Sequence, residues 1–324
     1  MTTIHGSIGI AVSGPAGRSA GDLIRSADIA MYTAKAGKDR FAVYEPRFHS
    51  RLRREHRLAL DLELALDGGE IVVHYQPIVS LDDGRLHALE ALVRWEHPTR
   101  GLLLPDEFLP AAEENGLMVQ IGKSVVGQAF DELGSVLELG TLGLWLNLGP
   151  AELTGDRLIE DLAVALARSG IDPDALTVEI TESGVFGDEQ RAIAAMANLR
   201  DLGVHLSIDD FGTGYSSLSR LAEFPIESVK IPLAFISRLT GDDQNETFVD
   251  AIIRLADSLG LATVAEGIEH PAAVRRLRRL GCSLGQGYLF SKPLPASELL
   301  PLLENPKQLR SVVASSRLSI AAAG

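Results

Sequence analysis

Two adjacent aspartates close one of the apolar, strand-like runs of this sequence. Asp209 and Asp210 follow the alternating residues 204–208 and precede Gly212 and Gly214. Within a strand, neighbouring side chains point to opposite faces, but the rule relaxes at the last residue, so both carboxylates can aim at one point. Two like charges disfavour each other unless a cation lies between them. The pair therefore predicts a bound cation.

Other polar side chains lie in or at the ends of further apolar runs. They are Glu90, Asn147, Glu179, Lys230, Glu266 and Gln286. A single buried glutamate is most often a salt-bridge partner or a helix cap. Five carboxylates on four runs are not explained in that way, because burying unpaired charge costs on the order of several kcal/mol per ion. The set therefore indicates one functional cluster.

The residue types of the cluster favour divalent metal ions. Carboxylate and amide oxygens are the ligands that Mg²⁺ and Mn²⁺ prefer. The cluster holds more carboxylates than one octahedral ion that also keeps water molecules can use. Two ions that share Asp209, about 3.5–4 Å apart, are the simplest arrangement, and Asp209 and Asp210 would hold this metal pair.

The elements that must position these residues alternate in type from residue 69 onward. Strands are predicted over 71–79, 86–95, 142–148, 176–182, 204–211, 228–232, 262–269 and 284–290, with helical segments such as 156–170 and 189–203 between them. This alternation favours parallel strands with helical crossovers. Eight strands fit an α/β fold of the TIM-type (β/α)8 barrel, in which the C-terminal strand ends meet on one face.

The segments outside this repeat are shorter. Residues 1–46 predict a β-α-β unit that is too small to bury a core by itself, and residues 47–67 predict a charged linker helix. That helix is either a solvated connector or a coiled-coil-like signalling helix, although its heptads are too few to support the second reading. The barrel domain spans 68–304 and a C-terminal tail spans 305–324.

Composition limits the classes of function. The formal net charge of −14 over 324 residues argues against broad binding to nucleic acid polymers. Cys282 is the lone cysteine, which excludes an internal disulfide and fits a reducing cytosol. The sequence contains no run of 18 apolar residues and no basic segment before the first apolar run, so we expect neither a membrane span nor a signal peptide. These features predict a cytoplasmic protein.

Several motifs resemble those of the EAL domain family of cyclic di-GMP phosphodiesterases. They are EALVRW (90–95), EITES (179–183), DDFGTGYSSL (209–218), VAEGIE (264–269) and GQGYLFSKPLP (285–295), and the resemblance covers roughly residues 50–300. It implies the EAL barrel fold and hydrolysis of cyclic di-GMP to linear 5′-pGpG by a two-metal mechanism that uses Mg²⁺ or Mn²⁺. It also implies a homodimer formed through the barrel.

The same resemblance implies roles for individual residues. One metal would be held by Glu90, Asn147, Glu179 and Asp209, and the second by Asp209, Asp210 and Glu266. Lys230 would help to hold the nucleophilic water, so that Glu90, Lys230, Asp210 and Glu266 form the catalytic set. A plain counter-ion role for Lys230 beside Asp209 is compatible with this. Substrate contacts would come from Gln76, Arg94 and Gln286, and Glu182 would support the glycine loop.

Residues 1–46 are similar to the C-terminal third of a GGDEF diguanylate cyclase domain, but the signature loop and earlier strands of that domain are absent. No cyclase chemistry is therefore expected. The EAL resemblance also has two departures. Pro232 stands where an aspartate is usual, and Gly149 where a serine is common. Two alternatives to an active enzyme are a catalytically silent receptor for cyclic di-GMP and a purely structural or dimerising module.

Overall fold

The computed structural model describes residues 6–13, 19–36, 40–137, 142–153, 158–187, 189–213, 221, 223–239 and 243–304. The second half of the predicted DDFGTGYSSL loop and the predicted C-terminal tail lie outside these ranges. Among the described residues, no helix combines the length and the apolar character needed to cross a membrane.

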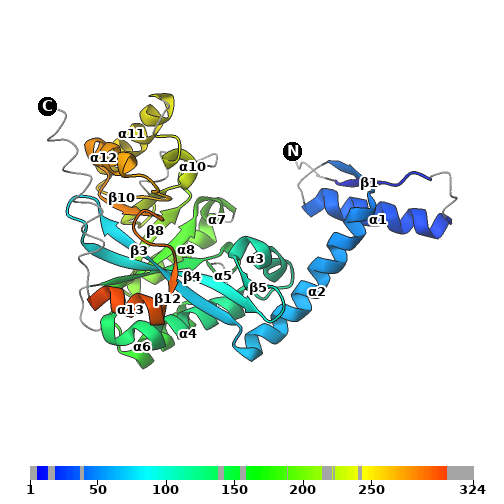
Figure 1. The fold of residues 1–324 in the computed structure, drawn as a ribbon, viewed down its shortest axis with the longest axis horizontal. Helices are drawn as coiled ribbons and strands as arrows, with labels where there is room; N and C mark the ends of the chain where they lie inside the picture. The colour runs from blue at the N-terminus through cyan, green and yellow to red at the C-terminus, as the bar shows by residue number, and fades with distance from the viewer. Residues whose placement is uncertain are drawn as a thin grey trace.

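Eight strands close into a barrel (Figure 1). In order round the barrel they are β3 (Ile71–Ser80), β4 (Leu86–His97), β6 (Gly143–Leu148), β7 (Leu176–Thr181), β8 (His205–Asp209), β9 (Ser228–Ile231), β10 (Ala262–Ala265) and β11 (Leu284–Gln286). The ring closes because β3 pairs with both β4 and β11. The predicted eight-stranded α/β barrel is confirmed, with each strand within the predicted ranges or close to them.

One strand departs from the predicted all-parallel arrangement. β3 runs antiparallel to β4 and to β11, whereas the pairs from β4 round to β11 are parallel. Residues 81–85 alone separate β3 from β4. A parallel neighbour needs a crossover of a dozen or more residues, so this short connection permits only an antiparallel hairpin.

The remaining elements cover the barrel and its ends. The helices are α3 (Pro105–Glu114), α4 (Met118–Leu137), α5 (Pro150–Leu153), α6 (Leu158–Ser169), η1 (Pro173–Ala175), α7 (Glu182–Gly187), α8 (Glu189–Asp201), α10 (Leu233–Ile236), α11 (Asp243–Ser258), α12 (Pro271–Leu280) and α13 (Ala296–Glu304). Short strands β5 (Gly101–Leu103) and β12 (Leu294–Pro295) pair with β4 and β3 at the edges of the barrel.

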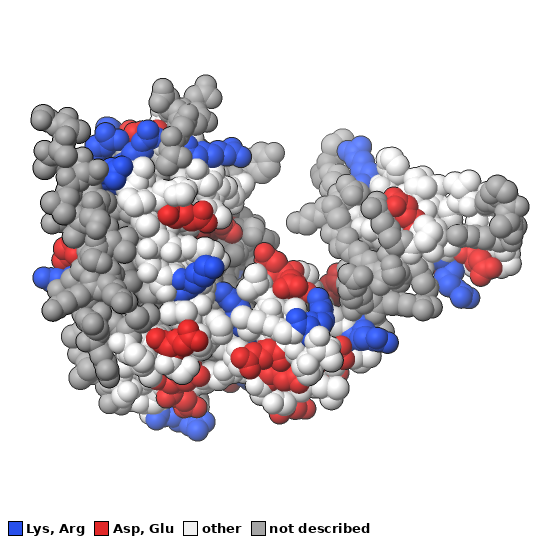
Figure 2. All heavy atoms as spheres, in the orientation of Figure 1, with Lys and Arg blue, Asp and Glu red and all other residues white. Residues whose placement is uncertain are grey.

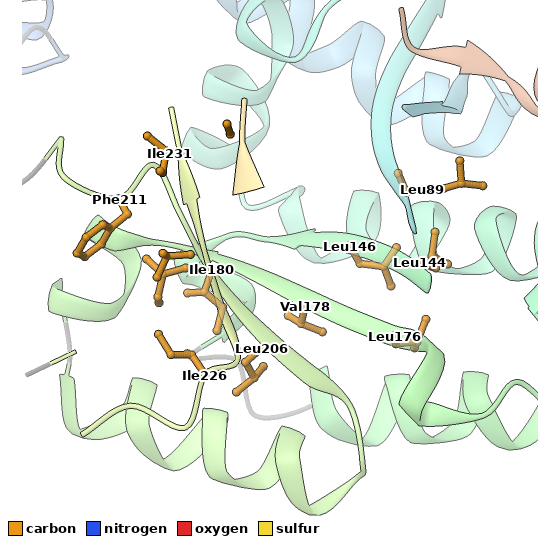
Figure 3. Packing of buried hydrophobic residues seen from close by; sticks show 14 of the residues in the cluster. Leu89, Leu144, Leu146, Leu176, Val178, Ile180, Leu206, Phe211, Ile226 and Ile231 are labelled. Carbon is orange, nitrogen blue, oxygen red and sulfur yellow. The ribbon is translucent and has the colours of Figure 1, made fainter. Parts of the chain in front are cut away.

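Alternation along each strand separates the core from the barrel interior. On β7, Leu176, Val178 and Ile180 face outward and join the main core between strands and helices, as Figure 3 shows. The residues between them, Thr177 and Glu179, belong to the other face because successive side chains point to opposite sides. The same period on β8 and β9 sends Ser207, Asp209, Ser228 and Lys230 inward. The strand pattern that builds the core thus also places the polar cluster.

A long helix, α2 (Pro46–Gly68), leads into the barrel from the N-terminal side. Its residues Leu58, Leu62 and Ala65 pack in a second core cluster against Trp95 and Phe108. At the far end of α2, away from the barrel, stands a unit of β1 (Ile8–Ile10), α1 (Ala20–Ala36) and β2 (Phe41–Val43), as Figure 1 shows.

The N-terminal unit is a parallel strand pair covered on one side by a helix. β1 and β2 pair in register from Ile8 to Ile10. A Cβ at Gly9 would collide with the backbone of Ala27, so glycine allows α1 to lie directly on β1. Ile8, Val12 and Phe41 remain largely exposed. The unit therefore does not enclose a core of its own.

Candidate active site

The predicted polar residues lie together at one end of the barrel interior. Asp209 and Gln286 are the last residues of β8 and β11, and Glu266 directly follows β10. Glu90 lies in the middle of β4, where it pairs with Trp145 of β6, and its carboxylate reaches the level of Asn147, two residues further along β6. On the antiparallel strand β3, Gln76 lies opposite Glu90. The end of the barrel thus gathers side chains from strands far apart in sequence.

The ammonium group of Lys230 lies at the centre of this cluster. Lys230 is fully buried. Its Nζ is 2.7 Å from Glu266 Oε1, 2.9 Å from Glu179 Oε1, 3.2 Å from Glu90 Oε2 and 3.9 Å from Asp209 Oδ1. One positive charge therefore faces carboxylates from four strands.

Amide side chains fix the orientation of Glu90. Asn147 Nδ2 donates to Glu90 Oε1 at 2.7 Å, and Gln286 Nε2 donates to Glu90 Oε2 at 2.6 Å. The same Gln286 nitrogen donates to Gln76 Oε1 at 2.9 Å, and Gln76 Nε2 donates to the carbonyl of Ser291 at 2.9 Å. Both oxygens of the Glu90 carboxylate are therefore held in one position, as a preorganised site requires.

Three of the acidic residues, Asp209, Asp210 and Glu266, form a triad beside Lys230 that is less buried than Glu90 and Glu179. One carboxylate oxygen from each of Asp209, Asp210 and Glu266 lies within 4.8 Å of the others. Asp210 has a φ of 55°, which is uncommon for a residue other than glycine. Its N–H donates to Asp209 Oδ1 at 2.8 Å. This left-handed turn at the end of β8 brings two adjacent aspartates to one side, as the sequence predicted.

The electrostatics of the site show an excess of negative charge. Burial raises the pKa of Glu179 well above its usual value, and the charge of Glu90 adds to this. Burial likewise raises the pKa of Asp210, with a contribution from Asp209, and the pKa of Glu266 to about 7. Burial alone would lower the pKa of Lys230, but the surrounding carboxylates, Glu179 first, raise it well above its usual value. Lys230 is therefore charged, yet it does not neutralise the cluster.

The donor set fits divalent cations. Both oxygens of Glu179 are buried and accept no hydrogen bond from any residue that the structure describes. Oε1 forms an ion pair with Lys230. Such an unsatisfied carboxylate is costly unless a cation binds it. Together with the triad of Asp209, Asp210 and Glu266, it offers the oxygen-rich surroundings that Mg²⁺ and Mn²⁺ prefer.

Glu182 lies outside this cluster but touches the segment that follows it. Glu182 Oε2 accepts a hydrogen bond from the N–H of Gly212 at 2.8 Å. The contact ties the first turn of α7 to the turn after β8, which is what a supporting role for the glycine loop requires. Residues 214–220 of that loop are not among those described, so the role of Glu182 stays a prediction.

Arg94 stands on the same strand as Glu90, four residues further on. It is buried, and its NH1 group donates to the carbonyl of Val93 at 2.7 Å. Burial lowers the pKa of Arg94, while electrostatic interactions with Tyr288 and Glu90 oppose this. Arg94 is thus close enough to the cluster to interact electrostatically with Glu90, and its role as a phosphate ligand stays a prediction.

One buried carboxylate outside the cluster is not evident from the sequence. Glu152 in α5 is 5% exposed, and its Oε2 accepts the N–H of Gly149 at 2.9 Å. A Cβ at Gly122 would collide with its other oxygen, so α4 approaches closely there. The segment LGPAEL carries no apolar period that would reveal this burial. Only the packing of α5 against α4 makes Glu152 an interior residue.

The fold and the site define a closed α/β barrel with a ring of acidic side chains suited to divalent cations. The chain belongs to the EAL domain family, because the family's sequence model matches residues 59–293.

The chain is similar in sequence to two bacterial proteins named as cyclic di-GMP phosphodiesterases. The bifunctional diguanylate cyclase/cyclic di-GMP phosphodiesterase MucR of Pseudomonas aeruginosa is 39% identical over 300 residues, which cover 92% of this chain and 44% of MucR. The cyclic di-GMP phosphodiesterase PdeR of Escherichia coli is 36% identical over 292 residues, covering 90% of this chain and 44% of PdeR. The chain thus spans less than half the length of these relatives.

A solved structure matches the barrel. The PaMucR phosphodiesterase in complex with c-di-GMP superimposes with a TM-score of 0.72 at 40% identity, over 75% of this chain and 99% of that one. The EAL enzyme Bd1971, with cAMP and cyclic di-GMP bound, gives a TM-score of 0.74 at 31% identity, over 78% of this chain and 69% of that one.

Proposed function

We propose that this protein hydrolyses cyclic di-GMP to linear 5′-pGpG with the help of two divalent cations. The observation that carries the proposal is the cluster of Glu90, Glu179, Asp209 and Glu266 round the buried Lys230. Membership of the EAL family supports it, as do the names of the phosphodiesterases MucR and PdeR and the c-di-GMP complex of PaMucR.

The cations would divide the carboxylates between them. One would be held by Glu90, Asn147, Glu179 and Asp209, and the other by Asp209, Asp210 and Glu266. Bound there, Mg²⁺ or Mn²⁺ would neutralise phosphate charge and make water more acidic. An acidic barrel needs such neutralisation, because its own charge repels a phosphodiester.

The side chains of the chain would orient the reactants. Lys230 forms ion pairs with Glu179 and Glu266 and would hold the attacking water in line with one phosphodiester. Arg94 would bind a phosphate oxygen with its guanidinium. Gln76 and Gln286 keep Glu90 fixed and would line the substrate cleft. No side chain is needed as a covalent nucleophile, because water attacks and the 3′ oxygen leaves.

We further propose that the N-terminal unit is a fragment of a GGDEF-like domain without cyclase activity. The alignment with the bifunctional MucR covers 92% of this chain and so extends beyond the EAL match at 59–293. A homodimer formed through the barrel remains a prediction of the EAL resemblance. A cytoplasmic location remains a prediction as well, supported by the single, buried cysteine Cys282.

The test is incubation of the purified protein with cyclic di-GMP and Mn²⁺, with the products separated by chromatography. We expect linear 5′-pGpG. Parallel titrations should measure Mn²⁺ binding by thermal shift and cyclic di-GMP binding in the presence of Ca²⁺. A protein that binds the dinucleotide tightly but turns it over with neither Mg²⁺ nor Mn²⁺ would be a silent receptor, and a protein that binds neither would be a structural module.

A further inference from the structure

One face of α2 is left uncovered by the rest of the described chain. Leu58, Leu62 and Ala65 turn toward the barrel and are buried. Leu60 and Leu64 lie on the opposite side and are 52% and 71% exposed. Because residues four apart lie on one helix face, Leu60 and Leu64 together form a small exposed apolar surface.

The residues at either end of this face carry opposite charge. Arg57 precedes Leu60 by three residues and Asp67 follows Leu64 by three, so that Arg57, Leu60, Leu64 and Asp67 form one stripe. All four are exposed. Among the residues that the structure describes, neither Arg57 nor Asp67 has an ion-pair partner within 4.0 Å. The stripe therefore runs from positive through apolar to negative.

We propose that this stripe binds the same stripe of a second copy of the chain, with the two α2 helices antiparallel. If the two-fold axis crosses the stripe at the level of residue 62, Arg57 lies opposite the partner subunit's Asp67, and Leu60 lies opposite the partner subunit's Leu64. A two-fold interface needs such self-complementary spacing. The stripe has this spacing, because positions 57 and 67, and positions 60 and 64, are equally far from residue 62.

Charge selects the antiparallel arrangement over the parallel one. A parallel pair would place Arg57 beside the partner subunit's Arg57, and Asp67 beside the partner subunit's Asp67. Like charges at such contacts are unfavourable, whereas opposite charges at the two ends of the apolar seam favour the antiparallel orientation. Asp61 and Glu63, on the two sides of the stripe, meet acidic neighbours in either orientation and do not select between them. The arrangement is also open sterically at the helix itself, because the barrel packs on the far face of α2 through Leu58 and Leu62.

The stripe is short, so the association is expected to depend on concentration. Two leucines from each copy bury little area compared with a standard interface. This contact is separate from any contact between the barrels and does not rest on the proposed enzymatic activity. It is therefore best tested by cross-linking at α2 rather than by overall size alone.

The experiment uses the full chain with single cysteines on the stripe. A tagged Leu60→Cys chain is mixed with an untagged Leu64→Cys chain under mild oxidation. We expect the mixed disulfide to exceed the two self-linked products at least about threefold, because only positions 60 and 64 face each other across the axis. Val164→Cys, at a 58% exposed position on α6, and the wild type, whose only cysteine is buried, are the controls.

Charge reversal tests the orientation independently. In the cysteine background, Arg57→Asp should reduce the mixed product several-fold, and adding Asp67→Arg should restore it. Circular dichroism and thermal unfolding confirm that each variant is folded. A mixed product no greater than that of Val164→Cys overturns the proposal. So does a preference for Leu60→Cys linked to itself, which would mark a parallel pair, or a failure of the double reversal to restore cross-linking.

Discussion

Glu90 is the most highly connected carboxylate in the site. It accepts hydrogen bonds from Asn147 and Gln286 and lies 3.2 Å from the ammonium of Lys230. Burial would raise its pKa, but Lys230 and these hydrogen bonds lower it, so Glu90 is ionised. An ionised carboxylate held on both oxygens is a residue with a defined task rather than a packing residue.

Glu90→Gln should reduce the rate of cyclic di-GMP hydrolysis by about 100-fold or more. The amide keeps the volume of the side chain but loses the charge that binds a cation and Lys230, and even losses next to a metal ligand cost about 10–100-fold. The measurement is initial rate with Mn²⁺, with unfolding temperature as a check on folding. Glu113→Gln, at an exposed position of α3, is the control. Retention of most of the activity would remove Glu90 from the metal-binding set.

Pro232→Asp should raise the hydrolysis rate about tenfold. Pro232 follows Lys230 and Ile231 and precedes α10 with φ −67° and ψ 154°, a conformation that aspartate adopts without strain and favours before a helix. The new carboxylate would lie near Lys230 and could orient the attacking water. Single-turnover rates measure the effect. Pro232→Asn is the matched control, because it keeps the cap without the charge.

Binding separates this effect from a change in affinity. Because Arg94 and the cations are assigned to the phosphates, cyclic di-GMP binding in Ca²⁺ should change little in Pro232→Asp. If the substitution instead weakens binding and leaves the chemical step untouched, the residue at 232 acts on the substrate and not on the water.

At the scale of elements, the turn after β6 depends on a buried carboxylate. Glu152 accepts the N–H of Gly149 two residues beyond Asn147. Burial raises the pKa of Glu152 from 4.5 to about 7, although the Gly149 hydrogen bond opposes this. The folded state therefore binds a proton more tightly than the unfolded state. Its stabilising contribution is complete below pH 4.5 and is lost as the pH rises through about 7.

Glu152→Gln should therefore make the protein more stable than the wild type at pH 8. The amide oxygen can still accept the Gly149 N–H, while the cost of a buried charge disappears. The raised pKa of Glu152 sets an upper limit, on the order of 3 kcal/mol, to the gain in the free energy of unfolding. Urea unfolding at pH 8 and pH 5 measures the difference, which should be much smaller at pH 5. An equal effect at both pH values, or the same effect in Glu114→Gln, would contradict a buried charge at 152.

Strand positions could be predicted because period-two alternation is a local property. The segments around Glu179, Asp209 and Lys230 were placed within one or two residues of the observed β7, β8 and β9. The direction of β3 was not predicted, because the alternation of element types favours parallel strands, and only the five-residue connection at 81–85 reveals the antiparallel pairing. Burial of Glu152 depends on the distant Gly122, and no local pattern carries that information.

At the scale of the whole molecule, acidic and basic side chains are interspersed over the face shown in Figure 2. The net charge of −14 is therefore spread over the molecule, and buried carboxylates gather inside the barrel at Glu90, Glu179 and their neighbours. The polar cluster could be predicted from sequence because each residue lies within, or directly after, an apolar strand of its own. Its central ion pairs could not, since Lys230 meets four carboxylates only once the barrel closes.

The N-terminal unit and the barrel are expected to be independent in catalysis. The unit lies at the far end of α2, as Figure 1 shows, while α2 itself is anchored to the barrel through Leu58, Leu62 and Ala65. Removing residues 1–45 should leave this anchor intact. The deletion should therefore change the rate of cyclic di-GMP hydrolysis by less than about twofold and leave the unfolding transition of the barrel in place.

The deletion should also reduce aggregation, because it removes the exposed apolar side chains of the N-terminal unit. Ile8, Val12 and Phe41 are exposed on the unit itself, and such surface promotes association. Light scattering on heating, compared between the full chain and the chain from Pro46, measures this. Cutting instead after Leu66 removes the α2 anchor and should destabilise the barrel, which serves as the contrasting variant. A large fall in rate for the chain from Pro46, with unfolding unchanged, would show that the N-terminal unit regulates the barrel.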